Sequence, residues 1–173
     1  MYKTFTSSTI SDNTYSSAIF SKCKRYRYAL TRSKKKSANL LLFILLNPST
    51  ATEIETDPTI TRCQKRASLL GYHSFRVCNL FAFRTKTPAI MKAHHDPIGF
   101  CNDMIINYSL REAKQVICAW GSHGNHLNRA EIIKELVRRS DTRAFHLGLT
   151  KNNQPKHPLY LRYSEVPIEW LAE

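Results

Sequence analysis

The stretch Leu40-Leu-Leu-Phe-Ile-Leu-Leu46, followed directly by Asn47-Pro48, indicates how this chain folds. A run of this length is far short of the roughly 20 apolar residues that cross a bilayer. A short apolar run that ends at a turn signal is typical of a strand covered on both faces. Such strands belong to parallel sheets with helices on either side. The run therefore predicts a layered α/β protein with this strand at its centre.

After this strand, helical and strand patterns alternate along the sequence. Asp57-Pro58 supplies a helix cap and a first-turn proline, and Gly71 suits the end of the same helix. The later predicted elements are a strand at 75–81, a helix at 102–113, a strand at 115–120, a helix over 127–137 and a strand at 143–149. Four strands separated by three helices predict a three-layer α/β/α sandwich around a central, mainly parallel four-stranded sheet.

The first part of the chain is strongly basic. Residues 1–37 hold nine Lys or Arg against one acid, Asp12. Residues 20–30 alternate basic with apolar or aromatic positions, which predicts a strand that turns at 31–37 and belongs to an N-terminal basic strand pair. The alternative is a solvated edge strand protected by its charges. We expect a single domain over 1–173, with a basic extension at 1–37 and an α/β core at 38–165.

Composition restricts the classes of partner. The 173 residues carry a net charge of +13, so a polyanion such as nucleic acid is the first partner to consider. No apolar stretch is long enough for a membrane span, and the N-terminus lacks the pattern of a secretory signal. Five cysteines without a Cys-x-x-Cys pair suit a reducing compartment. We expect a cytoplasmic monomer that does not bind membranes.

Polar residues follow the predicted strands at the edge where open α/β sheets bind ligands. Asn47 ends the central strand, where its amide can orient a water but cannot take a proton. Asn79 interrupts an apolar run, and its donor and acceptor complement the Watson–Crick edge of a pyrimidine. His157 lies in a polar loop, where it can donate to a developing anion. The structural alternatives are a turn residue, a satisfied buried amide and an ordinary loop histidine.

The sequence favours neither a metal nor a cofactor. His94-His95-Asp96 and the pair His123 and His126 are candidate ligands, but neither group has the spacing of a metal site. The cysteines lack the close pairs of an iron–sulfur site. There is no phosphate-binding loop, dinucleotide fingerprint or nucleophile elbow. We therefore predict chemistry that needs no bound metal or cofactor.

Four motifs, taken in order, resemble the motif series of the uracil-DNA glycosylase superfamily. They are Leu45-Leu46-Asn47-Pro48-Ser49, Val77-Cys78-Asn79-Leu80, Val116-Ile117-Cys118-Ala119-Trp120-Gly121-Ser122 and His157-Pro158-Leu159. The stretch from about Leu40 to Leu161 is also similar to the family known as domain of unknown function 1643. The signature of that family reads Asn-Pro-Ser-Thr-Ala, Asp-Pro-Thr, Asn-Leu-Phe-Ala, Trp-Gly-x-His-Gly and His-Pro-Leu-Tyr.

The glycosylase resemblance implies roles for individual residues. Asn47 positions the attacking water, and His157 stabilises the departing base anion. The residues implied to bind the flipped base are Asn79, Pro48, Ser49 and Phe81. The residues implied to bind DNA are Lys34, Lys35, Lys36, Ser122, His123, Pro158, Leu159, Tyr160 and Arg162, with 158–162 entering the minor groove as a wedge. Base excision requires such a flipped nucleotide and a donor at the leaving group.

The departures from the glycosylase pattern bear on the substrate. Leu45-Leu46 stand where glycine usually precedes the first motif residue, and the last motif reads His-Pro-Leu in place of His-Pro-Ser. The altered pocket suits a bulky modified pyrimidine such as the hypermodified cytosine of bacteriophages, so defence against phages is a hypothesis. No lysine occupies a motif position, which favours a monofunctional glycosylase that leaves an abasic site.

The sequence leaves three other interpretations open. One is a nucleic-acid-binding module without catalysis. Another is a small-molecule nucleoside hydrolase whose basic surface is incidental. The third is a nuclease that holds a metal with His123, His157 and Asp57.

Overall fold

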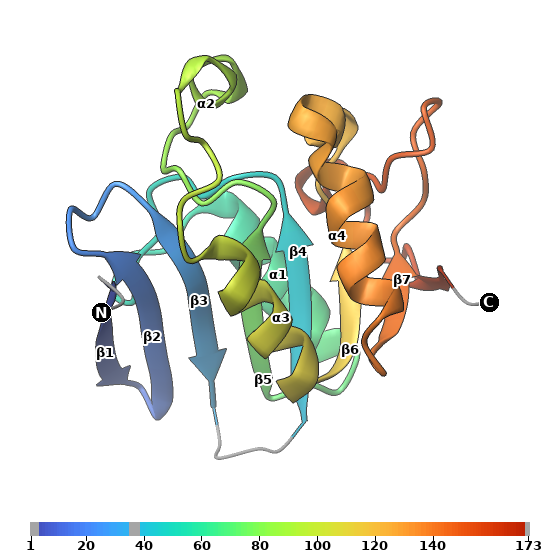
Figure 1. Ribbon diagram of the computed structural model, residues 1–173. Helices are drawn as coiled ribbons and strands as arrows, with labels where there is room; N and C mark the ends of the chain where they lie inside the picture. Colours follow the sequence, from blue (N-terminus) through green and yellow to red (C-terminus); the bar gives the residue numbers. More distant parts are fainter. Residues whose placement is uncertain (1–3, 35–38, 172–173) are drawn as a thin grey trace.

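The computed structural model describes residues 4–34 and 39–171. Over these residues the chain forms one sheet with the strand order β1-β2-β3-β5-β4-β6-β7-β8, flanked by helices (Figure 1). The strands are β1 (Thr4–Ser11), β2 (Thr14–Ser21), β3 (Arg27–Ser33), β4 (Leu40–Leu45), β5 (Ser74–Asn79), β6 (Ala113–Cys118), β7 (Arg143–His146) and β8 (Ile168–Glu169). The helices are α1 (Pro58–Leu69), α2 (Pro88–Ala93), α3 (Asn102–Glu112) and α4 (Arg129–Arg138), with short 3-10 helices η1 (Ser122–Asn128) and η2 (Pro158–Tyr160).

Strand β4 lies at the centre of the parallel part of the sheet, as its sequence predicts. It pairs in parallel with β5 on one side and β6 on the other, and β6 pairs in parallel with β7. All six residues of β4 are buried. Because the parallel strands point the same way, their carboxyl ends meet at one edge of the sheet, which we call the carboxyl edge.

The predicted four-stranded, mainly parallel sheet is wrong in strand number and direction. The sheet has eight strands over the described residues and is mixed. Strands β1, β2 and β3 form an antiparallel meander, β3 pairs antiparallel with β5, and β8 pairs antiparallel with β7. The sequence did not predict β1 because its residues are mostly Thr and Ser and show no apolar alternation. Strand β8 has two residues, too few for a recognisable pattern.

The predicted N-terminal strand pair is also corrected, because this region forms three strands. Residues 20–30, expected as one strand, contain the end of β2, a turn and the start of β3. The turn passes through Lys24 at φ 57, a left-handed conformation that the sequence does not announce with glycine or asparagine. Residues 35–38 lie outside the described residues.

Helices cover both faces of the parallel strands. Helices α3 and α4 pack on one face through a cluster that includes Ile106 and Ile133, and α1 packs on the other through Ile60 and Cys63 (Figure 1). Helix α1 begins where predicted, because Asp57 Oδ1 accepts a hydrogen bond from the Ile60 N–H at 2.9 Å. The three-layer arrangement is therefore present around these strands.

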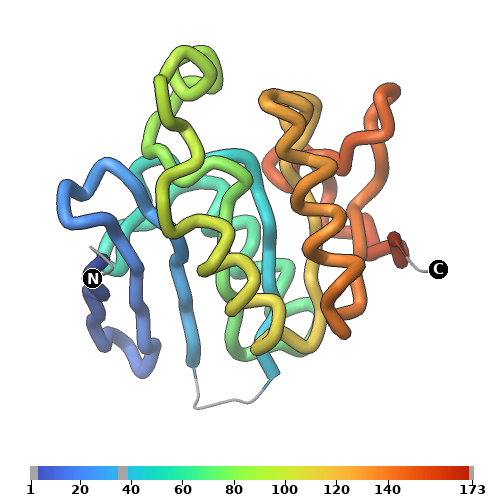
Figure 2. Tube along the Cα trace, in the orientation of Figure 1, coloured from blue at the N-terminus to red at the C-terminus, as the bar shows by residue number. Residues whose placement is uncertain are grey.

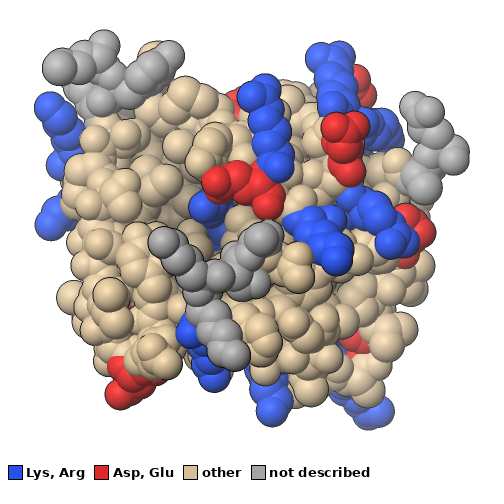
Figure 3. All heavy atoms as spheres, turned by 90° about the horizontal axis from the view of Figure 1, so that it is seen from below, with Lys and Arg blue, Asp and Glu red and all other residues tan. Residues whose placement is uncertain are grey.

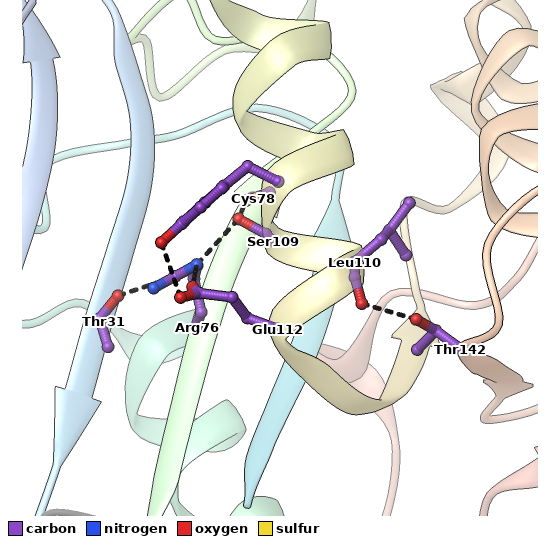
Figure 4. Close-up of polar contacts among 8 residues, drawn as sticks. Thr31, Arg76, Cys78, Ser109, Leu110, Glu112 and Thr142 are labelled. Carbon is purple, nitrogen blue, oxygen red and sulfur yellow. Dashed lines mark hydrogen bonds and ion pairs between the residues drawn. The ribbon is translucent and has the colours of Figure 1, made fainter. Parts of the chain in front are cut away.

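Polar contacts fasten α3 to the sheet (Figure 4). Arg76 on β5 donates through Nη1 to Ser109 Oγ at 3.2 Å and to Glu112 Oε2 at 2.6 Å. Its Nε donates to Thr31 Oγ1 on β3 at 3.1 Å, so one guanidinium ties together β3, β5 and α3. The basic meander is thus joined to the parallel strands by side chains as well as by the β3–β5 ladder.

The two edges of the sheet differ. At the carboxyl edge, the segment between β5 and α3 rises above the strand ends and carries α2 (Figure 2). The opposite edge, seen from below in Figure 3, mixes Lys and Arg side chains with Asp and Glu side chains. Among the described residues, no helix is long and apolar enough to cross a membrane.

Candidate active site

A cleft of about 920 Å³ opens at the carboxyl edge. Its walls come from the loop after β4, the start of α1, the segment before α2, the loop after β6 and the segment that ends in η2. Leu46 and Trp120 contribute apolar surface, and Lys86 and Lys156 contribute positive charge. Segments far apart in the sequence meet here because each follows an element that ends at the same edge.

His157 is held in the cleft as a neutral donor. Burial lowers the pKa of His157 to about 4, although the nearby Asp57 carboxylate opposes this shift. The imidazole is therefore uncharged at neutral pH. Its Nδ1 accepts a hydrogen bond from the Leu159 N–H at 3.4 Å, so the proton of the neutral ring lies on Nε2. No side chain or main chain of the described residues pairs with Nε2, which can donate to a ligand.

Asn47 is fixed with its oxygen available. Its Nδ2 donates to the main-chain oxygen of Thr85 at 2.7 Å and to that of Pro48 at 3.2 Å. Turning the amide over would bring its oxygen against these two carbonyls, which cannot donate. Within the described part of the chain, no donor contacts Asn47 Oδ1. The side chain can therefore accept a hydrogen bond from a water in the cleft and hold it in one orientation.

Asp57 also lines the cleft, whereas its place in the sequence predicts a helix cap and, as an alternative, a metal ligand. One carboxylate oxygen, Oδ1, caps α1, and the Asp57 charge also acts on the buried guanidinium of Arg27. The same charge acts on His157, so Asp57 and His157 lie within electrostatic reach of each other. The position of Asp57 at the start of a helix that follows the central strand is the sequence signal that points to this edge.

Trp120 forms part of the cleft wall and is itself rigidly held. The indole is 1% exposed, and its Nε1 donates to Gln154 Oε1 at 2.8 Å. The chain can pass this close to the ring only because residue 124 is glycine: a Cβ there would lie 2.2 Å from Trp120 Cδ1. At Gly121, φ is +73° and the N–H donates to the Pro155 oxygen at 2.8 Å, which joins the loop after β6 to the His157 segment.

The cleft gathers many of the residues predicted for the site. Those that line it are Asn47, Ser49, Ser122, His123, His157, Leu159 and Tyr160. Tyr160 is 84% exposed on η2, and its part in a wedge stays a prediction. The following residues are anchored to α1, where Arg62 Nη1 donates to the Leu161 oxygen at 2.8 Å and Arg66 Nη2 to the Arg162 oxygen at 2.7 Å.

Other predicted residues lie away from the cleft. Asn79 and Phe81 are buried, Phe81 in the cluster that packs α3 and α4 on the sheet. The β4–β5 pairing continues past the strand end, with the Leu80 N–H on the Leu45 oxygen at 2.8 Å and the Phe81 N–H on the Leu46 oxygen at 3.0 Å. Asn79 Oδ1 is buried without a hydrogen-bond partner among the described residues. The roles of both residues in base reading remain predictions.

Of the remaining predicted residues, some lie next to the cleft and others lie far from it. Pro48 and Pro158 are buried beside the cleft, and Arg162 is exposed beyond η2. Lys34 lies at the opposite edge, where its N–H donates to the His73 oxygen at 2.9 Å before β5 begins. Lys35 and Lys36 lie outside the described residues. Among the residues that the structure describes, no three His, Cys, Asp or Glu side chains gather as a metal-binding group.

Fold and site together define a mixed α/β protein with a cleft at the carboxyl ends of its parallel strands, lined by both polar and apolar side chains. Residues 27–159 match the family described as protein of unknown function (DUF1643), so the chain belongs to that family. The matched range includes β3 through most of η2 and every element of the cleft up to Leu159. Searches of the curated proteins and of the solved structures found no match. The glycosylase resemblance therefore rests on the four motifs.

Proposed function

We propose that the protein is a monofunctional DNA glycosylase that removes a flipped, modified pyrimidine and leaves an abasic site. The observation that carries the proposal is the neutral imidazole of His157, whose Nε2 can donate into a cleft that also holds Asn47 and Asp57. In this reaction the base leaves with the electron pair of the glycosidic bond and becomes an anion. The neutral imidazole stabilises this anion by donating a hydrogen bond from Nε2.

The other two side chains suit the sugar side of the same step. As the bond breaks, positive charge develops on the sugar, and the Asp57 carboxylate stabilises it. Asn47 Oδ1 orients the water whose oxygen then bonds to the anomeric carbon. The water transfers a proton to the Asp57 carboxylate, which then releases this proton to solvent. The released base anion takes up a proton from solvent. The bond changes balance without a metal or a redox partner.

The size and lining of the cleft favour a large base. Its volume of about 920 Å³ lies near the upper end of the usual range for ligand sites, about 300 to 1,000 Å³. A bulky hypermodified pyrimidine, flipped out with its sugar, uses more of this space than uracil does. Lys86 and Lys156 at the cleft suit the flanking phosphates. Bacteriophage DNA carries such bases, which makes defence against phages the proposed setting.

The test is an excision assay on defined DNAs with a chelator present. The DNAs contain uracil, a thymine mismatch, hydroxymethylcytosine or glucosylated hydroxymethylcytosine, and abasic sites are detected by alkaline cleavage and released bases by mass spectrometry. We expect alkali-dependent breaks and a free modified base. Strand breaks without alkali would indicate a nuclease, turnover of free nucleosides alone would indicate a small-molecule hydrolase, and intact DNA would contradict the proposal.

A further inference from the structure

A basic surface separate from the cleft lysines Lys86 and Lys156 also lies at the carboxyl edge. The turn between β2 and β3, which we call the basic turn, exposes Lys22, Lys24 and Arg25. Since β3 runs antiparallel to β5, the start of β3 lies at the end of β5, and the basic turn shares an edge with the cleft. The sequence has no acid between Asp12 and Glu53, so no charge within this segment offsets the three cations.

Direct contacts join the basic turn to the cleft wall. The Arg84 N–H donates to the Arg25 oxygen at 2.9 Å, and Arg84 Nη1 donates to the Lys24 oxygen at 3.1 Å. The next two residues of the chain, Thr85 and Lys86, line the cleft. A strand of nucleic acid that leaves the cleft past Lys86 therefore reaches the basic turn.

Arg25 is held in place from the protein side. Its Nη2 lies 2.8 Å from His94 Nε2, and because arginine can only donate, His94 Nε2 is the acceptor. The His94 ring stacks on Phe83, with ring centroids 3.8 Å apart. The guanidinium is thus positioned while its other N–H groups remain able to bind phosphate.

An aromatic cavity opens beside the basic turn. Its volume is about 490 Å³, and Tyr26, Tyr28 and Phe100 line it together with residues of the turn and of the segment that precedes α3. The Tyr26 and Tyr28 rings are nearly parallel, 7° apart; Tyr28 is 3% exposed and Tyr26 half-buried, whereas Phe100 is 85% exposed. Asp96 also lines the cavity, and since its Oδ1 accepts from the Gly99 N–H at 3.0 Å, the second oxygen can accept from a base amino group.

We infer that single-stranded DNA next to the target nucleotide binds here, with its phosphates on the basic turn and one unstacked base in the aromatic cavity. The inference rests on the proposed function for the nucleotide in the cleft. Cationic grooves beside exposed aromatic rings are the combination that binds single strands, because every base has a face that can stack. Bases in a duplex are already stacked and paired, so they cannot enter such a cavity without being unpaired.

The test compares DNA binding by fluorescence anisotropy on an unmodified oligonucleotide, single-stranded and as its duplex, over a range of salt concentrations. We expect wild type to bind the single strand more tightly. Phe100→Ala should weaken single-strand binding about 5- to 100-fold, because one stacked base is lost, and leave duplex binding nearly unchanged. The double variant Lys24→Gln and Arg25→Gln should lose two phosphate contacts. For the single strand, the slope of the logarithm of the binding constant against the logarithm of the salt concentration should then become shallower by about 1.4.

The matched control is the double variant Arg111→Gln and Lys114→Gln. These exposed residues lie at the end of α3 and the start of β6, at the opposite edge of the sheet, and should leave binding unchanged. Equal affinity for single strand and duplex, wild-type binding by Phe100→Ala, or tighter binding of matched single-stranded RNA would each overturn the inference. Because this DNA carries no excisable base, these results are independent of whether the protein excises one.

Discussion

The half-buried, neutral state of His157 predicts a specific loss of stability in acid. In the unfolded chain the histidine has its ordinary pKa of 6.5, whereas burial in the folded protein lowers it to about 4. Between these two values the unfolded chain binds a proton that the folded chain does not. Acidification through this window therefore favours unfolding, and the stability lost is regained as the pH rises above 6.5.

The size of this effect follows from the two pKa values. Going from pH 7 to about pH 4.5, the His157 imidazole should account for about 2 kcal/mol of lost unfolding free energy. The assay is urea unfolding followed by circular dichroism at both pH values, in wild type and in His157→Gln. Glutamine does not titrate, so the variant should lose about 2 kcal/mol less than wild type over this interval.

The comparison of the two proteins removes the contributions of other groups. Burial also lowers the pKa of His146, and this residue is present in both proteins, so its effect cancels. Equal pH dependence in wild type and His157→Gln would show that the imidazole titrates normally in the folded state. In that case it would not be the neutral donor on which the proposed chemistry depends.

Three further predictions concern the cleft. Asp57→Asn should keep the α1 cap and the fold but slow excision about 100-fold or more, because the charge is lost and the cap is not; an unchanged rate would remove Asp57 from the reaction. Asn47→Ala should abolish most excision while DNA affinity stays within about twofold, measured by anisotropy; loss of both together would indicate a structural role for the amide. Gly124→Ala should destabilise the fold by about 2 kcal/mol or more in urea unfolding, since the new methyl group meets the Trp120 ring; wild-type stability would show that the loop relaxes freely.

The predictable parts of the fold are those with strong local signals. The apolar run of β4 and the Asp57-Pro58 start of α1 each specify their element within a few residues, and the structure has both in place. Strand β1 lacks such a signal because hydrogen bonds to β2 over its whole length, and not burial of its own side chains, hold it in the sheet. The turn at Lys24 was missed because a non-glycine residue adopts the left-handed conformation there.

The candidate site shows the same division. Asn47 and His157 could be predicted because strand ends at the carboxyl edge converge, and both line the cleft. Asn79 satisfies the same rule in sequence, but the β4–β5 pairing extends beyond it and its side chain is buried outside the cleft. The sequence predicts Asp57 as a helix cap and, in the nuclease alternative, as a metal ligand, because capping already accounts for an aspartate before proline.

Single-turnover excision is the measurement that tests the central claim most directly. Wild type, His157→Ala and the control His73→Ala, an exposed histidine at the opposite edge, are each incubated in excess with DNA carrying one glucosylated hydroxymethylcytosine. The released base is quantified by mass spectrometry. We predict release by wild type and by His73→Ala at the same rate, and a rate about 100- to 1,000-fold lower for His157→Ala. Release by His157→Ala at the wild-type rate, or no release by any of the three proteins, would contradict the account.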